Sequence, residues 1–367
     1  MNPRQTAPTH FSDMRFTSRY LDARNNWLAM ASAFGASAQI ESIPHALKGP
    51  DGEALATDCL WLGAADAPRV IVTISGTHGI EGYAGNAIQC HWLEALQAGR
   101  QKLPADTALL CIHALTPWGM AWYRRCDEQG IDLNRNFIDF AQLPANADYA
   151  RVRDCLQLQD RDARVSALQD LQNELGQRRF EIAVSGGQYG DPKAPFFGGH
   201  QASHGRKVIE RLIRSRALFT RTLHVIDLHT GLGPRGEGEL ICDHPLDSAG
   251  LRASLAAFGS QITLPADGSS SSVPKHGLLD YAWHAGMNDK SFFLTLEFGT
   301  NSAAELFGCL EEDHRFWAER TPQRRDDAGW AVVREPMLAH FCPDDATWRN
   351  CVMQRGDEVF RTLLALS

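Results

Sequence analysis

"RVIVTISGTHGIEGYAG", residues 69–85, joins an apolar run to a turn that holds four glycines and two ionisable side chains. The first seven residues are almost continuously apolar, which is typical of a strand buried on both faces of a sheet. His78 and Glu81 follow in the turn, three positions apart. A histidine and an acid at this spacing are common by chance, so the turn alone leaves a metal site and an ordinary polar loop both open.

Three further apolar runs predict buried strands, and they alternate with helical patterns. The predicted strands are residues 107–115, 223–229 and 291–298, and the predicted helices are 86–99, 205–218 and 347–366. Segments 185–200 and 264–277 are rich in Gly, Pro and Ser and are expected to be long loops, which inside a compact domain are often functional. The alternation predicts an α/β fold: a mixed, largely parallel twisted sheet with helices on both faces.

Composition sets the class of protein. The 367 residues are 44% apolar and 22% charged, with no linker-like stretch, so we expect one globular domain over residues 1–367. The net charge of −8 comes without a basic stripe, which argues against a nucleic-acid partner. The amino-terminal residues lack the apolar core of a signal peptide, and no apolar run is long enough to cross a bilayer, so a cytoplasmic protein without a membrane partner is expected. The oligomeric state is left open.

Cysteine chemistry does not supply a metal site here. The nine cysteines are scattered and include no pair separated by two residues, which indicates neither a disulfide framework nor a thiolate zinc cluster. Any metal would therefore be held by histidine and carboxylate.

Ionisable residues stand at the ends of three predicted strands. His78 and Glu81 follow the first, Asp227 and His229 end the third, and Glu297 lies near the end of the fourth. The carboxyl ends of strands in an α/β sheet are where ligands bind, so these side chains are expected to converge. Each taken alone is more often a capping group or an edge ion pair.

Two imidazoles and one carboxylate form a donor set suited to zinc. Such a set leaves the fourth position open for a water molecule whose pKa zinc lowers to about 7. A catalytic site then needs a separate base, and Glu297 is the candidate because it is a lone acid in an apolar strand, where burial raises a carboxyl pKa. Asp227 lies two residues before His229, on the same side of an extended strand, and is a candidate to support that imidazole.

Charged residues gather in segment 122–137, between the first and third predicted strands. Arg124 and Arg125 precede Asp132, Asn134 and Arg135 in a stretch without clear periodicity. A guanidinium beside an amide can bind a carboxylate in bidentate fashion. The alternative is a solvated loop with surface ion pairs.

In combination these motifs resemble the zinc carboxypeptidase superfamily, and more closely a bacterial branch of it known mainly as a domain of unknown function. The matching stretches are "SGTHGIEGYAG", "TPWGMAWYRRCDEQGIDLNRNF", "IDLHTGLG" and "TLEFGT", in the family's order and over about residues 70–300. The aspartoacylase and succinylglutamate desuccinylase group is a more distant resemblance.

The resemblance implies a role for each motif. His78, Glu81 and His229 would bind one Zn²⁺ per chain, and Glu297 would be the general base. Asn134 and Arg135 would hold the substrate's free carboxylate, and Asp132 would orient the first zinc histidine. Arg125 would stabilise the oxyanion, with Arg124 as the alternative for this place beside the substrate.

Two loop residues each allow two interpretations. In this superfamily a tyrosine often closes over the substrate, and Tyr189 is a candidate whose alternative is a packing role. Arg235 lies in a loop that borders the expected pocket. Its side chain is expected to face the surface in preference to the pocket.

The expected activity is zinc-dependent hydrolysis of an amide bond next to a free carboxylate, as in a metallocarboxypeptidase. The alternative is an N-acyl amino acid deacylase, and the substrate is accordingly a small peptide or an N-acyl amino acid. A non-catalytic binding module of the same fold is a third reading, opposed by the completeness of the residue set. No serine-hydrolase turn of the type GxSxG is present.

Overall fold

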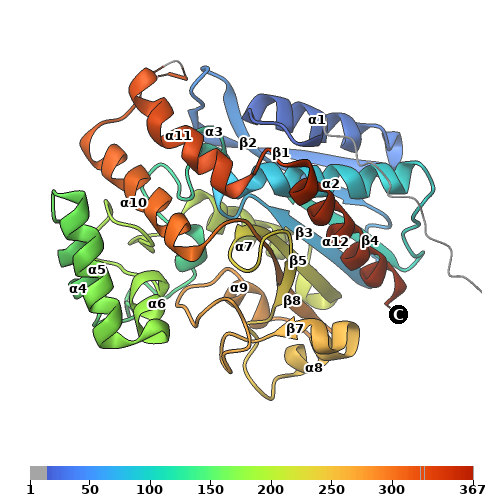
Figure 1. Cartoon of the computed structure of the whole chain (residues 1–367). Helices are drawn as coiled ribbons and strands as arrows, with labels where there is room; N and C mark the ends of the chain where they lie inside the picture. The colour runs from blue at the N-terminus through green and yellow to red at the C-terminus, as the bar shows by residue number, and fades with distance from the viewer. Residues whose placement is uncertain (1–14, 323, 326, 367) are drawn as a thin grey trace, which may run out of the picture.

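The computed structural model describes residues 15–322, 324–325 and 327–366, and the amino-terminal segment considered above lies mostly outside them. A mixed sheet of eight strands crosses the molecule in the order β1-β2-β4-β3-β5-β8-β6-β7 (Figure 1). The strands are β1 (Ala38–Lys48), β2 (Ala54–Leu62), β3 (Arg69–Ser75), β4 (Thr107–His113), β5 (Thr222–Gly231), β6 (Gly238–Ile241), β7 (Ile262–Thr263) and β8 (Phe292–Gly299).

The four strands predicted from apolar runs are the four central ones. Strands β4, β3, β5 and β8 are mutually parallel, whereas β2 and β6 pair antiparallel on either side of them. The sequence did not reveal the four strands outside this centre: β1 is mostly exposed and contains Pro44, β2 is buried but includes polar residues such as Asp58, and β6 and β7 are short. The predicted fold class is confirmed, because a largely parallel centre is buried and only the margins are antiparallel.

Both faces of the central strands are buried, which explains their unbroken apolar sequence. In β3, Ile71 belongs to one core cluster, whereas Val70, Val72 and Ile74 belong to the cluster on the opposite face. Successive side chains of a strand point to opposite faces, so most positions of a strand covered on both sides are apolar.

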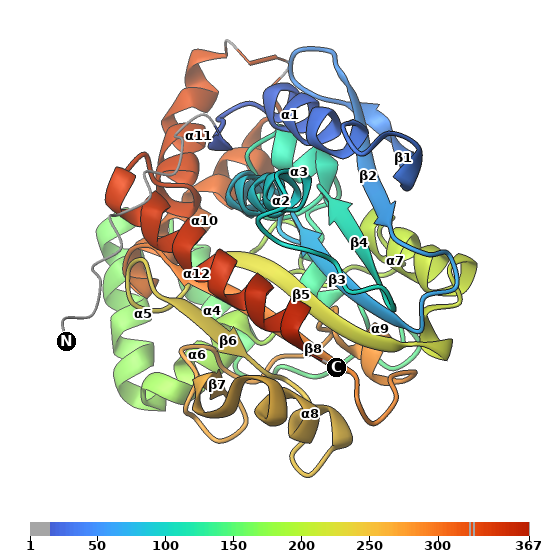
Figure 2. The same ribbon diagram turned by 90° about the vertical axis from the view of Figure 1, so that its right-hand side faces the viewer.

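Helices cover the two faces unequally (Figure 2). The helices are α1 (Tyr20–Ser32), α2 (Gly82–Gln97), α3 (Pro117–Ala121), α4 (Tyr149–Leu156), α5 (Arg161–Leu175), α6 (Gln177–Ser185), α7 (His204–Ser215), α8 (Ala249–Phe258), α9 (Tyr281–His284), α10 (Ala303–Glu319), α11 (Ala328–Phe341) and α12 (Ala346–Ala365). Helices α1, α2 and α12 pack on one face, where Trp92 stacks on Phe360 with ring centroids 4.5 Å apart. Helices α7 and α9 cover the other face.

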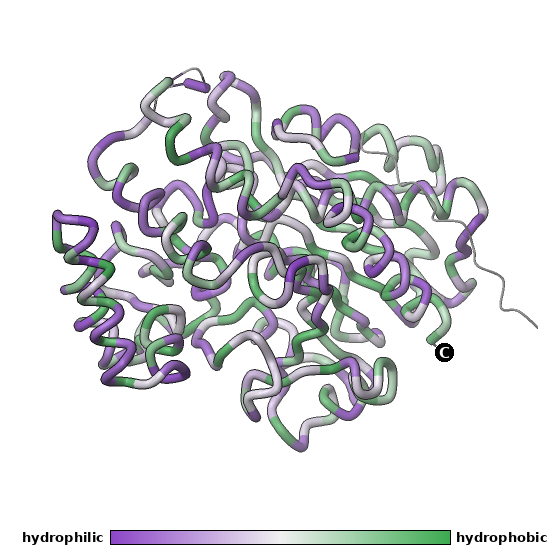
Figure 3. The backbone as a smooth tube through the Cα atoms, in the orientation of Figure 1, coloured by the Kyte–Doolittle hydropathy of each residue, from purple (hydrophilic) through white to green (hydrophobic). Residues whose placement is uncertain are grey.

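A group of outer helices lies beyond the sheet. Helices α4, α5 and α6 stand together beside α10 (Figure 1). In Figure 3 the tube of α4 and α5 changes repeatedly between hydrophilic and hydrophobic colour, as expected for helices with one buried side. Within the described part of the chain, no helix is both long and apolar enough to cross a membrane.

Glycines allow the turn after β3 to bend tightly toward its neighbours. Gly76 has φ +72°, a left-handed conformation that favours glycine. A Cβ at Gly79 would overlap the backbone of Gly119, and one at Gly85 would lie 2.6 Å from the Cβ of Ser75. The turn and the start of α2 therefore sit directly against β3 and the α3 segment.

Candidate metal centre

The ionisable residues at the strand ends converge on one side of the sheet. His78 and Glu81 lie in the turn after β3, and Glu81 ends the short 3₁₀ helix Gly79–Glu81 that precedes α2. His229 and Glu297 are directly paired in the register of β5 and β8. The chain runs from β3 to β4 on one side of β3 and returns to β5 on the other, so β3 is a topological switch point, where α/β sheets form their ligand crevices.

Three donor groups face one another within this crevice. The Nδ1 of His78 lies 3.0 Å from Glu81 Oε1, and the Nδ1 of His229 lies 3.1 Å from Glu81 Oε2. The two Nδ1 atoms are 3.1 Å apart. All three side chains are buried, and their donor atoms lie within 4.8 Å of one another.

A carboxylate stands behind each imidazole. His78 Nε2 lies 3.1 Å from Asp132 Oδ1, and His229 Nε2 lies 2.7 Å from Asp227 Oδ2. Asp227 is itself held, because Thr77 Oγ1 donates to its Oδ1 at 2.7 Å. When each Nε2 donates its proton to the carboxylate behind it, each Nδ1 presents a lone pair to the centre.

This donor set fits a zinc ion. Two lone pairs and a carboxylate at such short separations repel one another unless a cation lies between them. Zinc binds such donors at about 2.0–2.2 Å, which places tetrahedral neighbours about 3.3 Å apart, close to the separations seen here. Histidine nitrogen and carboxylate oxygen are donors that zinc accepts in catalytic sites.

The electrostatics of the centre favour positive charge. Burial opposes ionisation of His229, but Asp227 and Glu81 outweigh it and hold the His229 pKa well above its usual value. For Glu81, burial is likewise outweighed by the adjacent His78 and His229, and its pKa is lowered. The surrounding carboxylates therefore stabilise a cation at this point.

Arg125 reaches the centre from segment 122–137. Its Nη1 lies 3.0 Å from Glu81 Oε1 and its Nε lies 3.1 Å from Asp132 Oδ2. Burial disfavours its charge, but these two carboxylates raise its pKa. The guanidinium thus connects a candidate ligand with the acid behind the first imidazole.

Arg124 does not take the place beside the substrate that was considered for it. Its side chain points to α10, where Nε lies 2.9 Å from Asp313 Oδ2 and the guanidinium carbon is 4.8 Å from the Trp317 ring. The side chains of these two adjacent residues point to different parts of the molecule, one to α10 and the other to the donor cluster. Their spacing in the sequence therefore could not show which of the two reaches the cluster. The backbone has a use that the sequence did not reveal: the carbonyls of Arg125 and Arg124 accept hydrogen bonds from Gly79 N and Ile80 N and fix the turn after β3.

Glu297 lies beside the donor cluster. Its Oε1 accepts a hydrogen bond from Leu232 N at 3.0 Å, and its side chain is 7% exposed. Burial and the negative charge of Glu81 raise the Glu297 pKa to about 7. Such a carboxyl can both accept and release a proton near neutral pH.

Asn134 and Arg135 line the same crevice. Arg135 donates from Nε and Nη2 to the Ser185 carbonyl at 2.9 and 2.7 Å, which fixes its guanidinium. Asn134 Oδ1 accepts a hydrogen bond from Leu279 N at 2.7 Å. The acceptors of Arg135 are carbonyls, so its positive charge is oriented but not neutralised.

The two open loop residues lie elsewhere. Tyr189 is buried and donates from its hydroxyl to the Arg135 carbonyl at 2.8 Å, and it is not among the residues that line the crevice. This position is the one that the packing alternative describes. Arg235 faces the surface, with Nη2 2.8 Å from Asp345 Oδ2.

The crevice opens into a cavity of about 410 Å³ between the ends of the central strands and helices α5, α6 and α10. His78, His229, Arg125 and Glu297 stand at its wall, and much of the remaining lining is apolar. The predicted loops 185–200 and 264–277 both contribute lining residues, including Phe196 and Lys275. Lys275 and Asp243 had no sequence signal, because a single charged residue in a loop is unremarkable.

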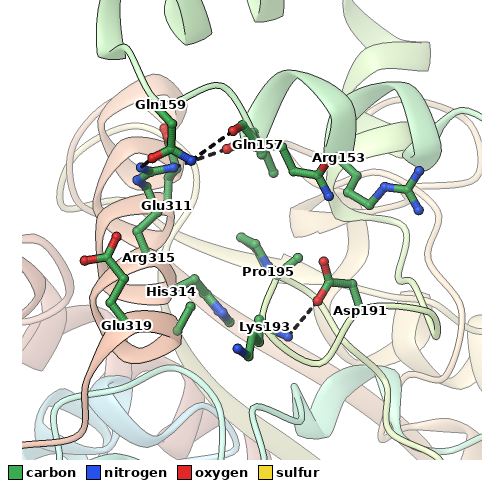
Figure 4. A pocket seen from close by; sticks show the side chains of 13 residues that line it. Arg153, Gln157, Gln159, Asp191, Lys193, Pro195, Glu311, His314, Arg315 and Glu319 are labelled. Carbon is green, nitrogen blue, oxygen red and sulfur yellow. Dashed lines mark hydrogen bonds between the residues drawn. The ribbon is translucent and has the colours of Figure 1, made fainter.

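A second cavity of about 450 Å³ lies away from the donor cluster. Figure 4 shows its wall, which is formed by α4, the loop around Lys193 and one side of α10. Its lining includes both basic and acidic side chains, among them Arg153, Arg315, Asp191 and Glu319. Its lining contains none of the candidate metal donors, so we do not assign the site to it.

Comparison with family models matches residues 16–355 to the family described as "Protein of unknown function (DUF2817)". No curated protein matches the chain.

Solved structures share the fold at low sequence identity. Carboxypeptidase A from Helicoverpa armigera is 13% identical, with a TM-score of 0.53, over 99% of this chain and 77% of its own. Bovine thrombin-activatable fibrinolysis inhibitor, in complex with tick carboxypeptidase inhibitor, is 12% identical with a TM-score of 0.50, over 89% of this chain and 98% of its own. The succinylglutamate desuccinylase from Chromobacterium violaceum has 15% identity and a TM-score of 0.37, over 90% and 75% of the two chains. The first two establish a carboxypeptidase-like fold.

Proposed function

The chain belongs to the family described as a protein of unknown function (DUF2817), and on the geometry of its site we propose that it is a zinc-dependent hydrolase. The proposed reaction is cleavage of an amide bond next to a free carboxylate, in a small peptide or an N-acyl amino acid. The observation that carries the proposal is the convergence of His78, Glu81 and His229 beside Glu297, in a cavity that also contains Arg135. The carboxypeptidase-like fold is consistent with it.

We assign His78, Glu81 and His229 as zinc ligands, with Asp132 and Asp227 orienting the two imidazoles. When bound there, zinc would act as a Lewis acid that polarises the scissile carbonyl and lowers the pKa of a water molecule. The two aspartates hold the Nε2 side of each imidazole, so that each Nδ1 points at the centre and is more basic toward a metal ion, which lowers the cost of assembling the site.

Glu297 moves the proton in this proposal. Its carboxylate accepts a proton from the attacking water as the new C–O bond forms. It then donates that proton to the nitrogen of the leaving amine as the C–N bond breaks. Burial and the charge of Glu81 raise the pKa of this carboxyl, which suits both steps because the group becomes a stronger base than an ordinary carboxylate and can still release the proton.

Two arginines complete the proposed site. Arg135, with Asn134 beside it, binds the free carboxylate, and the carbonyl acceptors that hold its guanidinium keep it in position. Arg125 stabilises the oxyanion, since its fork is fixed between Glu81 and Asp132 at the metal end of the cavity.

A substrate panel separates the proposed activities. The zinc-loaded protein is incubated with short peptides and with N-acyl amino acids, and product release is measured. Cleavage of the peptides identifies a carboxypeptidase, and cleavage of the N-acyl series identifies a deacylase. Cleavage of neither series would contradict the proposed hydrolase and favour a non-catalytic binding module.

The variant Glu297→Gln tests the catalytic assignment. It keeps the shape of the side chain and removes its basicity, so zinc content should match the unaltered protein while kcat/KM falls about 10²- to 10⁴-fold. Near-normal turnover by this variant would rule out Glu297 as the base.

A further inference from the structure

Lys275 lines the same cavity as Arg125 and Arg135. It lies in the loop between β7 and α9, and its Nζ donates to Val273 O at 2.9 Å and to Ser272 Oγ. Arg135 and Lys275 both line the cavity, and among the described residues neither has a carboxylate within 4.0 Å. Cations that donate hydrogen bonds to carbonyl and hydroxyl oxygens, as these two do, can each still bind an anion.

Hydrogen bonds hold the backbone of the loop that carries Lys275. Glu239, which pairs with Glu297 in the register of β6 and β8, accepts hydrogen bonds from Ser270 Oγ at 2.8 Å and Ser271 N at 3.1 Å. On the other side of Lys275, Tyr281 donates from its hydroxyl to the Lys275 carbonyl at 3.0 Å. The backbone on both sides of the lysine is therefore fixed.

The same framework fixes Lys275 relative to Arg135. His276 N donates to Gly186 O at 3.0 Å, next to the Ser185 carbonyl that holds the Arg135 guanidinium. Phe137 N donates to Gly277 O at 3.1 Å, two residues beyond Arg135. Backbone hydrogen bonds thus join the supports of the two cations, so their spacing is set before a ligand arrives.

We propose that Lys275 binds a second carboxylate, so that the preferred substrate releases an amino acid with an acidic side chain, such as glutamate or aspartate. This inference rests on the proposed function, in which Arg135 takes the first carboxylate. Because Arg135 and Lys275 have no carboxylate within 4.0 Å among the described residues, we expect the pair to select a ligand with two anionic groups, and a neutral side chain would leave Lys275 without an anionic partner.

Acids line the cavity as well, namely Glu181, Asp243, Glu297 and Glu311, and Asp243 is the carboxylate whose charge acts most on Lys275 and would favour a basic side chain instead. Burial raises the pKa of Asp243, while the charges of Lys275 and Arg135 oppose that rise. Burial and the charge of Arg135 lower the Lys275 pKa to about 8, which leaves the lysine mostly charged at pH 7. The ammonium of Lys275 donates only to Val273 O and Ser272 Oγ within the described part of the chain, and this geometry favours an anionic side chain.

The test compares substrates that end in glutamate with those that end in glutamine, which has nearly the same shape without the charge. Wild-type protein should cleave the glutamate member with a kcat/KM about 10- to 100-fold higher. Lys275→Gln should reduce this ratio to near one, and Lys275→Arg should restore part of it. Because the measured quantity is a ratio, a general loss of activity cancels. Lys102→Gln, at an exposed lysine, is the matched control and should keep the wild-type ratio.

Asp243→Asn is the second variant, and it should retain the preference for glutamate. Equal or better cleavage of glutamine- or lysine-ended substrates by wild-type protein would overturn the inference while leaving the proposed hydrolase intact. An unchanged ratio in Lys275→Gln would overturn it too.

If no substrate is cleaved, the proposed function fails and binding decides the inference separately. Calorimetry of the zinc-loaded protein with N-acetylglutamate and N-acetylglutamine then measures the preference directly. Tighter binding of N-acetylglutamate that is lost in Lys275→Gln supports the role of Lys275, and equal binding of the two compounds contradicts it.

Discussion

At the scale of residues, two aspartates orient the histidine donors of the candidate metal centre. Asp132 and Asp227 each accept from an imidazole Nε2, and Asp132 also lies next to Arg125. Burial would raise the Asp132 pKa, but Arg125 and His78 lower it well below the usual value, so this carboxylate stays ionised. The negative charge behind the histidines raises their basicity toward a metal ion.

Removing that support should weaken metal binding without unfolding the chain. Asp132→Asn and Asp227→Asn are each expected to reduce zinc affinity about 10- to 100-fold, because the amide can no longer fix the imidazole as a charged acceptor. Competition with a zinc-binding dye measures the affinity. Asp66→Asn, at an exposed aspartate, is the control and should bind zinc as the wild type does. Unchanged affinity in both buried variants would contradict the assignment.

The pH dependence of turnover follows from Glu297. The base must be deprotonated to accept a proton from water, so kcat/KM should fall as pH drops through the Glu297 pKa. In the metal-free protein that pKa is about 7, and the positive charge of bound zinc lowers it. The profile should therefore show an acidic limb at or below about pH 7, and the residual activity of Glu297→Gln should lack it. If the acidic limb of the kcat/KM profile lies at the same pH in wild type and in Glu297→Gln, another group is responsible for it.

At the scale of elements, two adjacent arginines connect the turn after β3 to different parts of the molecule. Arg125 meets the metal centre, whereas Arg124 ties the same bend to α10 through Asp313. Their carbonyls hold Gly79 and Ile80, so the bend supports the turn from both its backbone and its side chains. Movement of α10 would thus reach the centre through this segment.

The two arginines should give opposite phenotypes. Arg124→Gln leaves Asp313 buried without its charge partner and should lower the free energy of unfolding by about 3–5 kcal/mol, measured by denaturant titration. Arg125→Gln should mainly lower kcat/KM, by about 10²- to 10³-fold, because a donor to the developing oxyanion is lost. Each variant is the control for the other. A reversed pattern, with stability lost at Arg125 and activity at Arg124, would contradict these assignments.

The elements differ in how well the sequence predicts them. Strands β3, β4, β5 and β8 are covered on both faces, so their apolar runs are unmistakable. Strand β1 has one largely exposed side and a proline, and β7 is two residues long, so neither leaves a clear pattern. Helix α12 was predicted within one residue at each end, because its buried positions recur at helical spacing.

The residues of the candidate site also differ in how well the sequence predicts them. His78, Glu81, His229 and Glu297 were identifiable because an ionisable residue at the end of an apolar strand is unusual. The directions of the Arg124 and Arg125 side chains, and the positions of Tyr189 and Lys275, depend on loops that pack against distant segments. Tertiary contacts set those conformations, and local sequence carries little information about them.

At the scale of the whole molecule, the fold brings together residues that are distant in the sequence. They meet at the carboxyl ends of the central strands. The turn after β3, the ends of β5 and β8 and segment 122–137 contribute the proposed machinery. Helices α5, α6 and α10 enclose the cavity in which it stands. The proposed division of labour is a metal centre fixed by the sheet and a substrate pocket completed by helices and loops.

The zinc content of the purified protein tests this account most directly. After reconstitution with zinc and dialysis without chelator, elemental analysis should find about one zinc per chain in the wild type. His229→Ala should retain less than about a tenth of that and show an unchanged circular dichroism spectrum. A wild-type chain without zinc, or a folded His229→Ala variant with the full wild-type content, would contradict the proposed metal centre.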